Sequence, residues 1–166
     1  MAEFIEVSRM LPADPWSVAE TFWDIEGWHR IWNPISEVRV THSDPVLQDF
    51  EMVVVRDDKL EHIRTVRVRQ HRDIEFFSPV PPPMMASHRG AWRFSPLADG
   101  CQVTAIRHYR LRIASTPEDM SVWAYRRQFR ESFERRLGDI LDCFVTYFSN
   151  NGEKLRPIDT TRGAAS

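Results

Sequence analysis

A few polar residues stand within otherwise apolar stretches of the sequence, and their chemistry is the first guide to function. Arg67 alternates with valines, and His108 lies at the centre of the run IRHYR. An imidazole exchanges protons near neutral pH, and a guanidinium donates charge-assisted hydrogen bonds to anionic oxygens. Alternation alone leaves two interpretations open for each residue, because a strand side chain points either into the fold or to solvent.

Two further groups of residues are candidates for a site. Acids recur near the C-terminus, at Glu134, Asp139 and Asp142. Large aromatic residues that could line a pocket are Trp28, Trp32, Phe50, Trp92, Phe129 and Phe133. Core packing would account for these aromatic side chains as fully as a ligand would.

Several common chemistries have no support in the sequence. The motifs GxGxxG, GxxxxGK[ST], GxSxG and HExxH are all absent. The six histidines lack ligand spacing within any one expected element, so no metal site is predicted. Cys101 and Cys143 have no CxxC spacing and fit buried thiols in a reducing compartment.

Charge and hydropathy exclude other classes of function. The chain has 22 Lys+Arg and 24 Asp+Glu, a net charge of -2, which gives no global field for nucleic acid or an acidic membrane. No apolar run approaches the roughly 20 residues that a membrane span needs, and residues 1–10 do not resemble a signal peptide. A soluble, cytoplasmic protein is expected.

Local patterns predict the elements that would position these residues. A strand near residues 4–10 precedes a helix that starts at Asp14-Pro15 and ends at Gly27, and a second short helix covers residues 28–32. Six strands are expected at about 36–41, 48–56, 60–70, 74–77, 86–95 and 101–113. The proline-rich residues 79–83 should only connect strands. A last helix of roughly 30 residues should begin at Thr116-Pro117.

This order of elements predicts an α+β domain in which one curved antiparallel sheet wraps around the long C-terminal helix. A sheet cannot close tightly against so long a helix along its whole length, so an internal apolar cavity is expected. We assign residues 1–149 to this domain and residues 150–166 to a loosely ordered tail.

Three segments carry a resemblance to a known family. They are DIEGW at residues 24–28, TVRV at 65–68, and GAWRF at 90–94 with the run from Gly100 to His108 that follows. In this order they resemble the START-like (SRPBCC, helix-grip) aromatase/cyclases of type II polyketide synthesis, including those of the tetracenomycin type. The resemblance covers about residues 4–148.

The resemblance implies roles for particular residues. It places Arg67 in the cavity as a ligand for carbonyl or enolate oxygens, and it makes His108, paired with an acid such as Glu134 on the last helix, the proton-transfer group. It also implies that the aromatic residues named above line the cavity. Ile35 stands where tetracenomycin-type members have a pocket tyrosine, so a mechanism using that tyrosine is not expected.

The implied activity is a cofactor-independent and metal-free polyketide cyclase of antibiotic biosynthesis. It would fold a poly-β-ketone tethered to an acyl carrier protein, and promote aldol cyclisation and dehydration to an aromatic ring. Partners would include the carrier and other type II polyketide synthase components, but no nucleic acid or membrane. A basic rim for the carrier would come from Arg89 and Arg93, or from Arg126, Arg127 and Arg130.

Two other classes of function are compatible with the same sequence. A noncatalytic carrier of a hydrophobic small molecule or lipid needs the same fold and only one polar anchor. An interaction module that offers residues 79–83 as a polyproline ligand is disfavoured, because the run is short.

Overall fold

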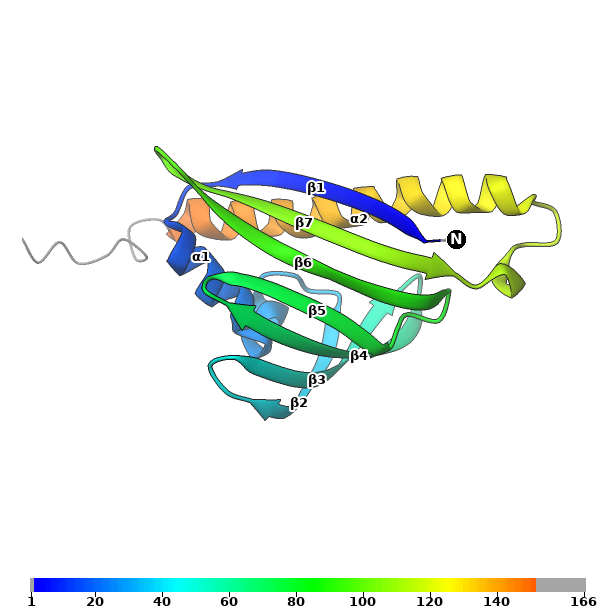
Figure 1. Cartoon of the computed structure of the whole chain (residues 1–166), viewed down its shortest axis with the longest axis horizontal. Coiled ribbons are helices and arrows are strands. Elements are labelled where there is room, and N and C mark those ends of the chain that lie inside the picture. The colour runs from blue at the N-terminus through cyan, green and yellow to red at the C-terminus, as the bar shows by residue number, and fades with distance from the viewer. Residues whose placement is uncertain (1, 152–166) are drawn as a thin grey trace, which may run out of the picture.

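One antiparallel sheet of seven strands curves around a long C-terminal helix (Figure 1). The computed structural model describes residues 2–151. The strands are β1 (Glu3–Leu11), β2 (Ile35–Ser43), β3 (Leu47–Arg56), β4 (Lys59–Gln70), β5 (Asp73–Val80), β6 (Met85–Leu97) and β7 (Gly100–Leu111). They lie in the order β1-β7-β6-β5-β4-β3-β2. Strands β2 to β7 form a meander, and β1 pairs with β7 at its end. The predicted helix-grip architecture is confirmed.

The strand boundaries differ from the sequence prediction by three residues at most. The largest difference is at β5, which includes Pro79 and Val80, so the expectation that residues 79–83 only connect strands is wrong for these two. Val80 pairs with Arg64 of β4, and β5 pairs with β6 only as far as Phe77. Pro79 has no N–H to donate, but it lies beyond the part of β5 that pairs with β6, so no hydrogen bond to β6 is lost.

The first helix near the N-terminus is shorter than predicted, and the second begins earlier. Helix α1 (Pro15–Trp23) is capped by Asp14, whose side chain accepts hydrogen bonds from the backbone N–H groups of Trp16 and Ser17, both 3.0 Å long. The next segment is a 3₁₀ helix, η1 (Ile25–Arg30), which Asp24 caps. The second helix, expected at residues 28–32, therefore starts three residues earlier than predicted, and it is a 3₁₀ helix and not an α-helix.

The long helix α2 (Val122–Asn151) starts later than its proline signal suggests. Pro117 opens a turn that Met120 closes by a backbone bond of 3.1 Å, after the 3₁₀ helix η2 (Ile113–Ser115). The Ser121 hydroxyl then caps Ala124. At its other end α2 passes the expected boundary at residue 149, and the remainder of the predicted tail lies outside the described residues. None of the helices in the described part combines the length and hydropathy needed to cross a bilayer.

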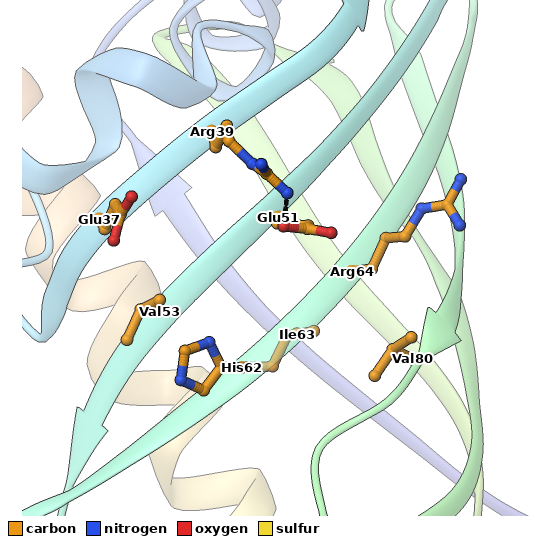
Figure 2. Close-up of a pocket in the computed structure, with 8 residues that line it drawn as sticks. All are labelled: Glu37, Arg39, Glu51, Val53, His62, Ile63, Arg64 and Val80. Carbon is orange, nitrogen blue, oxygen red and sulfur yellow. Dashed lines mark hydrogen bonds and ion pairs between the residues drawn. The ribbon is translucent and has the colours of Figure 1, made fainter.

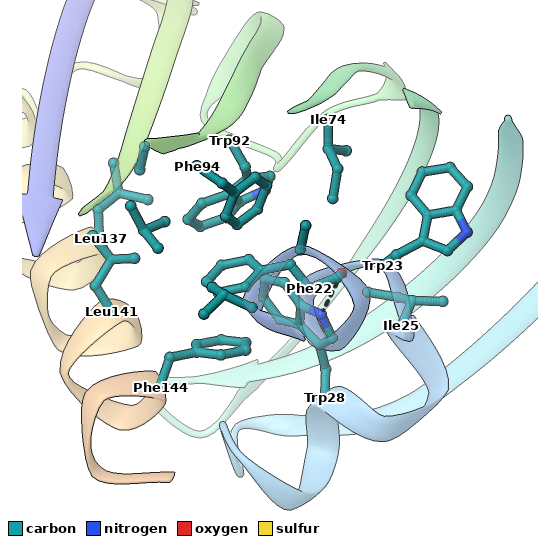
Figure 3. Packing of buried hydrophobic residues seen from close by; sticks show 14 of the residues in the cluster. Phe22, Trp23, Ile25, Trp28, Ile74, Trp92, Phe94, Leu137, Leu141 and Phe144 are labelled. Atoms are coloured by element: carbon teal, nitrogen blue, oxygen red, sulfur yellow. Dashed lines mark hydrogen bonds between the residues drawn. The ribbon is translucent and has the colours of Figure 1, made fainter. Parts of the chain in front are cut away.

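The C-terminal half of α2 packs into a dense aromatic core (Figure 3). Phe144 stacks on Phe22 of α1 with ring centroids 3.9 Å apart, and Trp28 meets Phe144 and Trp92 edge-on. The Trp28 indole donates a 2.9 Å hydrogen bond to the Phe22 carbonyl. This packing closes one end of the molecule and leaves the N-terminal half of α2 to cover the other.

Candidate functional site

A cavity of about 680 Å³ opens beneath the N-terminal half of α2. Its walls come from that helix half, the β3–β4 hairpin, the β5–β6 connection and the segment before α2. The lining residues are Arg56, Asp57, Lys59, Leu60, Glu61, Pro83, Met84, Pro117, Met120, Tyr125, Gln128, Phe129, Glu131, Ser132, Arg135 and Arg136. We call this opening the mouth.

The concave face of the sheet beside the mouth is incompletely covered. Met52, Thr65 and His88 face inward from β3, β4 and β6, yet each keeps part of its surface accessible. Helix α2 packs mainly against β1, at the opposite edge of the sheet. The fold therefore leaves space between α2 and the middle strands, as the sequence predicts.

Four polar side chains lie on this inner side, and we call them the interior polar cluster: His88 of β6, Arg107 and Tyr109 of β7, and Arg136 of α2. His88 and Tyr109 both pack against the Phe133 ring, at centroid distances of 5.8 and 5.3 Å. The Arg136 guanidinium lies 5.6 Å from the same ring. Phe133 is thus the common neighbour of three of the four groups.

Three atoms of the cluster are buried without a hydrogen bond. They are Nε2 of His88, the hydroxyl of Tyr109 and Nε of Arg136; Tyr125 at the mouth has an unpaired hydroxyl as well. Each buried unpaired polar atom costs about 1–3 kcal/mol. Native structures keep such atoms rarely, and a bound ligand or water is a common reason for them.

Arg107 is held by its neighbours, but some of its N–H groups have no acceptor. Its guanidinium lies over the rings of Trp92 and Phe76, at 4.4 and 4.6 Å, and Nη1 donates to the carbonyls of Ala91 and Ile106. Among the described residues Nε and Nη2 have no hydrogen-bond acceptor. Arg107 is only 5% exposed, so these donors have little contact with solvent.

Burial determines the protonation of the cluster. It lowers the pKa of His88 to about 3, with Arg107 and Arg56 adding to the effect, so the imidazole is neutral. It lowers the pKa of Arg107 to about 9 and that of Arg136 to about 10, and both remain charged near pH 7. It raises the pKa of Tyr109 to about 12, which keeps the phenol protonated.

Arg67 lies on the concave face, but its N–H groups bond to other parts of the protein. Its Nε donates to Gln48 Oε1 at 3.0 Å, Nη1 to the Phe22 carbonyl at 2.8 Å and Nη2 to the Trp23 carbonyl at 2.7 Å. With a second bond from Nη2 to Gln48, four of its five N–H groups are used. Arg67 therefore ties β4 to the C-terminal end of α1, and it is not among the residues that line the mouth. His88, Arg107 and Tyr109 do not line the mouth either.

His108 and Glu134 neither contact Arg67 nor line the mouth. In β7 the odd-numbered residues are buried, so His108 points to the convex face, where its ring lies 5.0 Å from Phe4. Glu134 forms an ion pair with Arg130 at 3.1 Å, one turn earlier on α2. The predicted juxtaposition of Arg67, His108 and Glu134 is therefore absent from the structure.

The six predicted lining aromatics fall into two groups. Phe129 lines the mouth and Phe133 lies beneath it, beside the interior polar cluster. Trp28, Phe50 and Trp92 are buried in the core, and Trp32 is half-buried against it.

Two shallow grooves on the convex face of the sheet are weaker candidates. One lies over β2, β3 and β4, with α2 behind the strands in the view of Figure 2. Both of its arginines are already paired, Arg39 with Glu51 and Arg64 with Asp49. The other groove contains His108 and Phe4. No three His, Cys, Asp or Glu side chains among residues 2–151 are grouped so that they could hold a metal ion.

Sequence reasoning missed the interior polar cluster, although one signal for it was available. Val103, Ala105, Arg107 and Tyr109 share a parity with Cys101, and the small apolar members of that set indicate the inward face. That parity places Arg107 inside and His108 outside. A comparable signal exists for His88, which shares its parity on β6 with Trp92 and Phe94. Arg136 stands three residues after Phe133, on the apolar side of α2.

The comparisons with known proteins show the fold. No family model matches the sequence, and no curated protein matches it. The Zhui aromatase/cyclase from Streptomyces sp. R1128 has a similar structure, with a TM-score of 0.79 and 16% identity over 91% of this chain and 96% of that chain.

Two other solved structures extend the comparison. The di-domain ARO/CYC StfQ of the steffimycin biosynthetic pathway gives a TM-score of 0.83 at 16% identity, covering 92% of this chain and 53% of that one. A START superfamily protein from Mycobacterium smegmatis gives 0.67 at 10% identity, covering 92% and 99%. The chain therefore has the START-like helix-grip fold, which these aromatase/cyclases share.

Proposed function

We propose that this protein is a polyketide aromatase/cyclase, which binds a carbonyl-rich chain between its sheet and α2 and promotes regiospecific aldol cyclisation and dehydration. The observation that carries the proposal is a set of donors without partners on the inner side of the sheet. They are Arg136 Nε and the Tyr109 hydroxyl, which are buried, and Arg107 Nε and Nη2. These groups lie among aromatic rings, so they suit a mostly apolar ligand that carries several oxygen atoms able to accept hydrogen bonds.

A poly-β-ketone has this character. Its ketone oxygens accept hydrogen bonds, and the methylenes between them are acidic, so an enolate forms where positive donors are fixed nearby. Arg107 supplies a guanidinium that the Trp92 and Phe76 rings hold in place. We assign to Arg107 the oxyanion-binding role that the family resemblance gave to Arg67, because the donors of Arg67 are already occupied.

The mouth suits a substrate that enters while tethered. Its lining holds four basic residues, Arg56, Lys59, Arg135 and Arg136, and three acids, Asp57, Glu61 and Glu131. The Arg56 guanidinium pairs with Glu61 at 3.0 Å. An acyl carrier protein is acidic in the related family, so we place the docking of the carrier at the basic residues of this opening, of which Lys59 and Arg135 are exposed. The likeness of the fold to solved aromatase/cyclases supports this choice of substrate class.

The alternative is a noncatalytic carrier of a hydrophobic molecule. A fatty acid or sterol needs a single polar anchor, whereas the interior here holds several separate unpaired donors. Each would remain unpaired beneath an alkyl chain, at a cost of about 1–3 kcal/mol apiece. The donor set therefore favours an oxygen-rich ligand.

The test is product analysis of a reconstituted minimal type II polyketide synthase with and without the protein. We expect one regiospecific aromatic product to replace spontaneous shunt products. Arg107→Met should restore the shunt profile, whereas Arg39→Met, on the convex face, should behave as the unmodified protein. An unchanged profile with folded protein and loaded carrier would overturn the cyclase assignment and favour the carrier.

A further inference from the structure

His88 is the one histidine on the concave face of the middle strands. It occupies the position on β6 directly opposite Tyr109 on β7. Its ring meets Phe76 edge-on at 5.1 Å and Phe133 at 5.8 Å. Phe76 also lies beneath the Arg107 guanidinium, so the imidazole and the guanidinium share one aromatic neighbour. Its Nε2 atom is buried without a partner.

The contact with Ser78 determines which nitrogen of His88 carries the hydrogen. The Ser78 hydroxyl lies 3.3 Å from Nδ1, and no other hydrogen bond of this buried hydroxyl occurs among the described residues. If Nδ1 were the donor, the hydroxyl hydrogen would be buried without an acceptor, at a cost of about 1–3 kcal/mol. The better arrangement has Ser78 donating to Nδ1, which leaves the hydrogen on Nε2.

The surroundings of the ring keep it neutral. Arg107 of β7, Arg56 of β3 and Arg136 of α2 are positively charged, Glu61 of β4 is paired with Arg56, and the Tyr109 phenol is uncharged. A second proton on the imidazole would add to the positive charge of this region. A neutral ring with hydrogen on Nε2 can donate one hydrogen bond and cannot accept a proton at that atom.

We propose that the Nε2–H of His88 is a neutral hydrogen-bond donor to the enolate oxygen of a bound 1,3-dicarbonyl, acting with Arg107 and the Tyr109 hydroxyl as an oxyanion site. Ser78 is the positioning residue that fixes the tautomer. The proposal rests on the proposed function for the substrate class, but it assigns to His88 the opposite role from a general base. It leaves the identity of the proton acceptor open.

The first experiment measures the ionisation of a small 1,3-diketone, benzoylacetone, by its ultraviolet absorbance when bound to the protein. We expect the bound diketone to ionise at lower pH than the free molecule. His88→Gln keeps an N–H donor near the place of Nε2 and should retain the shift. His88→Leu should reduce the enolate fraction at a given pH about 10-fold, the usual worth of a hydrogen bond to a charged group. His62→Leu, on the convex face, is the matched control.

The second experiment observes the tautomer directly. Long-range ¹H–¹⁵N spectra of the imidazoles should show His88 protonated at Nε2 and neutral from pH 8 down to pH 5. Ser78→Ala should produce a mixture of the two tautomers and weaken the diketone shift, without changing the fold measured by circular dichroism.

The outcomes separate this proposal from the proposed function. Equal loss in His88→Gln and His88→Leu, or an Nδ1-protonated ring, would overturn the donor role. Absence of any shift in the unmodified protein would overturn the oxyanion site. A shift that depends on His88 as expected, in a protein that leaves polyketide products unchanged, would support the donor role while refuting the cyclase function.

Discussion

His88 and Tyr109 face one another across adjacent strands, and both direct unpaired polar atoms beneath the N-terminal half of α2. Antiparallel partners of this kind lie about 5 Å apart at Cβ, so their side chains share one environment. That environment is aromatic, because Phe129 and Phe133 of α2 pack on Tyr109. Buried donors there cost folding free energy, and a ligand that accepts their hydrogen bonds recovers it.

The burial of His88 makes stability depend on pH. The unfolded chain protonates this imidazole below its ordinary pKa of 6.5, whereas the folded protein does so only near pH 3. Between these values the unfolded state holds more protons, so the free energy of unfolding falls as the pH drops below about 6.5. The loss is at most about 1.4 kcal/mol per pH unit. Urea denaturation at pH 7.5, 6 and 4.5 measures it.

His88→Gln provides the reference for this measurement, because glutamine does not titrate. We expect the stability difference between the two proteins to be constant above pH 7 and to move in favour of the variant as the pH falls. A difference that stays constant down to pH 4.5 would show that the imidazole is solvated in the folded state.

Arg67 should be essential for stability. Arg67→Met removes the donors to the Phe22 and Trp23 carbonyls and to Gln48, and leaves these acceptors buried. We expect a loss of about 3 kcal/mol or more in the free energy of unfolding. Arg39→Met is the control, since its ion pair with Glu51 is largely exposed and should change stability by less than about 1 kcal/mol. Equal effects in the two variants would contradict the tie between β4 and α1.

These cases show how far local patterns reach. Period-two alternation and turn residues predict the strands, and the apolar stripe from Phe129 to Phe148 predicts the helix that they enclose. The same alternation in β7 separates Arg107 from His108, since neighbours on a strand point to opposite faces. The prediction for His108 rested on the resemblance to the family and did not use that parity.

The remaining features depend on contacts between distant segments. Nothing local to Arg67 shows that the carbonyls of Phe22 and Trp23 arrive beside it, 45 and 44 residues away. Likewise His88 and Arg136 meet at Phe133 only because α2 crosses the sheet at that point. A sequence pattern records which face a residue occupies, but not which partner uses its donors.

Gly90 should tolerate no side chain. It pairs with Arg107, and a Cβ atom there would lie 2.0 Å from the Ile106 carbonyl oxygen and 3.0 Å from the Phe76 ring. Gly90→Ala must displace β6 from β7, because the carbonyl oxygen at 2.0 Å belongs to the β7 backbone, and it also crowds the Phe76 ring. We expect a loss of about 1–3 kcal/mol, measured by urea denaturation. Ser87→Ala, at an exposed position of the same strand, is the control; a stability equal to that control would show that the strands yield without cost.

Arg136 should show a trade between stability and binding. Its guanidinium is half-buried between Phe129 and Phe133, and its Nε has no hydrogen bond. Arg136→Met keeps the length of the side chain and removes the buried charge, so the free protein should become more stable by about 1 kcal/mol. The affinity for benzoylacetone should fall about 10-fold, because a charge-assisted donor to the ligand is lost. Thermal denaturation and titration of the same samples test both halves, with Arg39→Met as the control. A variant that loses stability and keeps its affinity would show that Arg136 supports the helix and not the ligand.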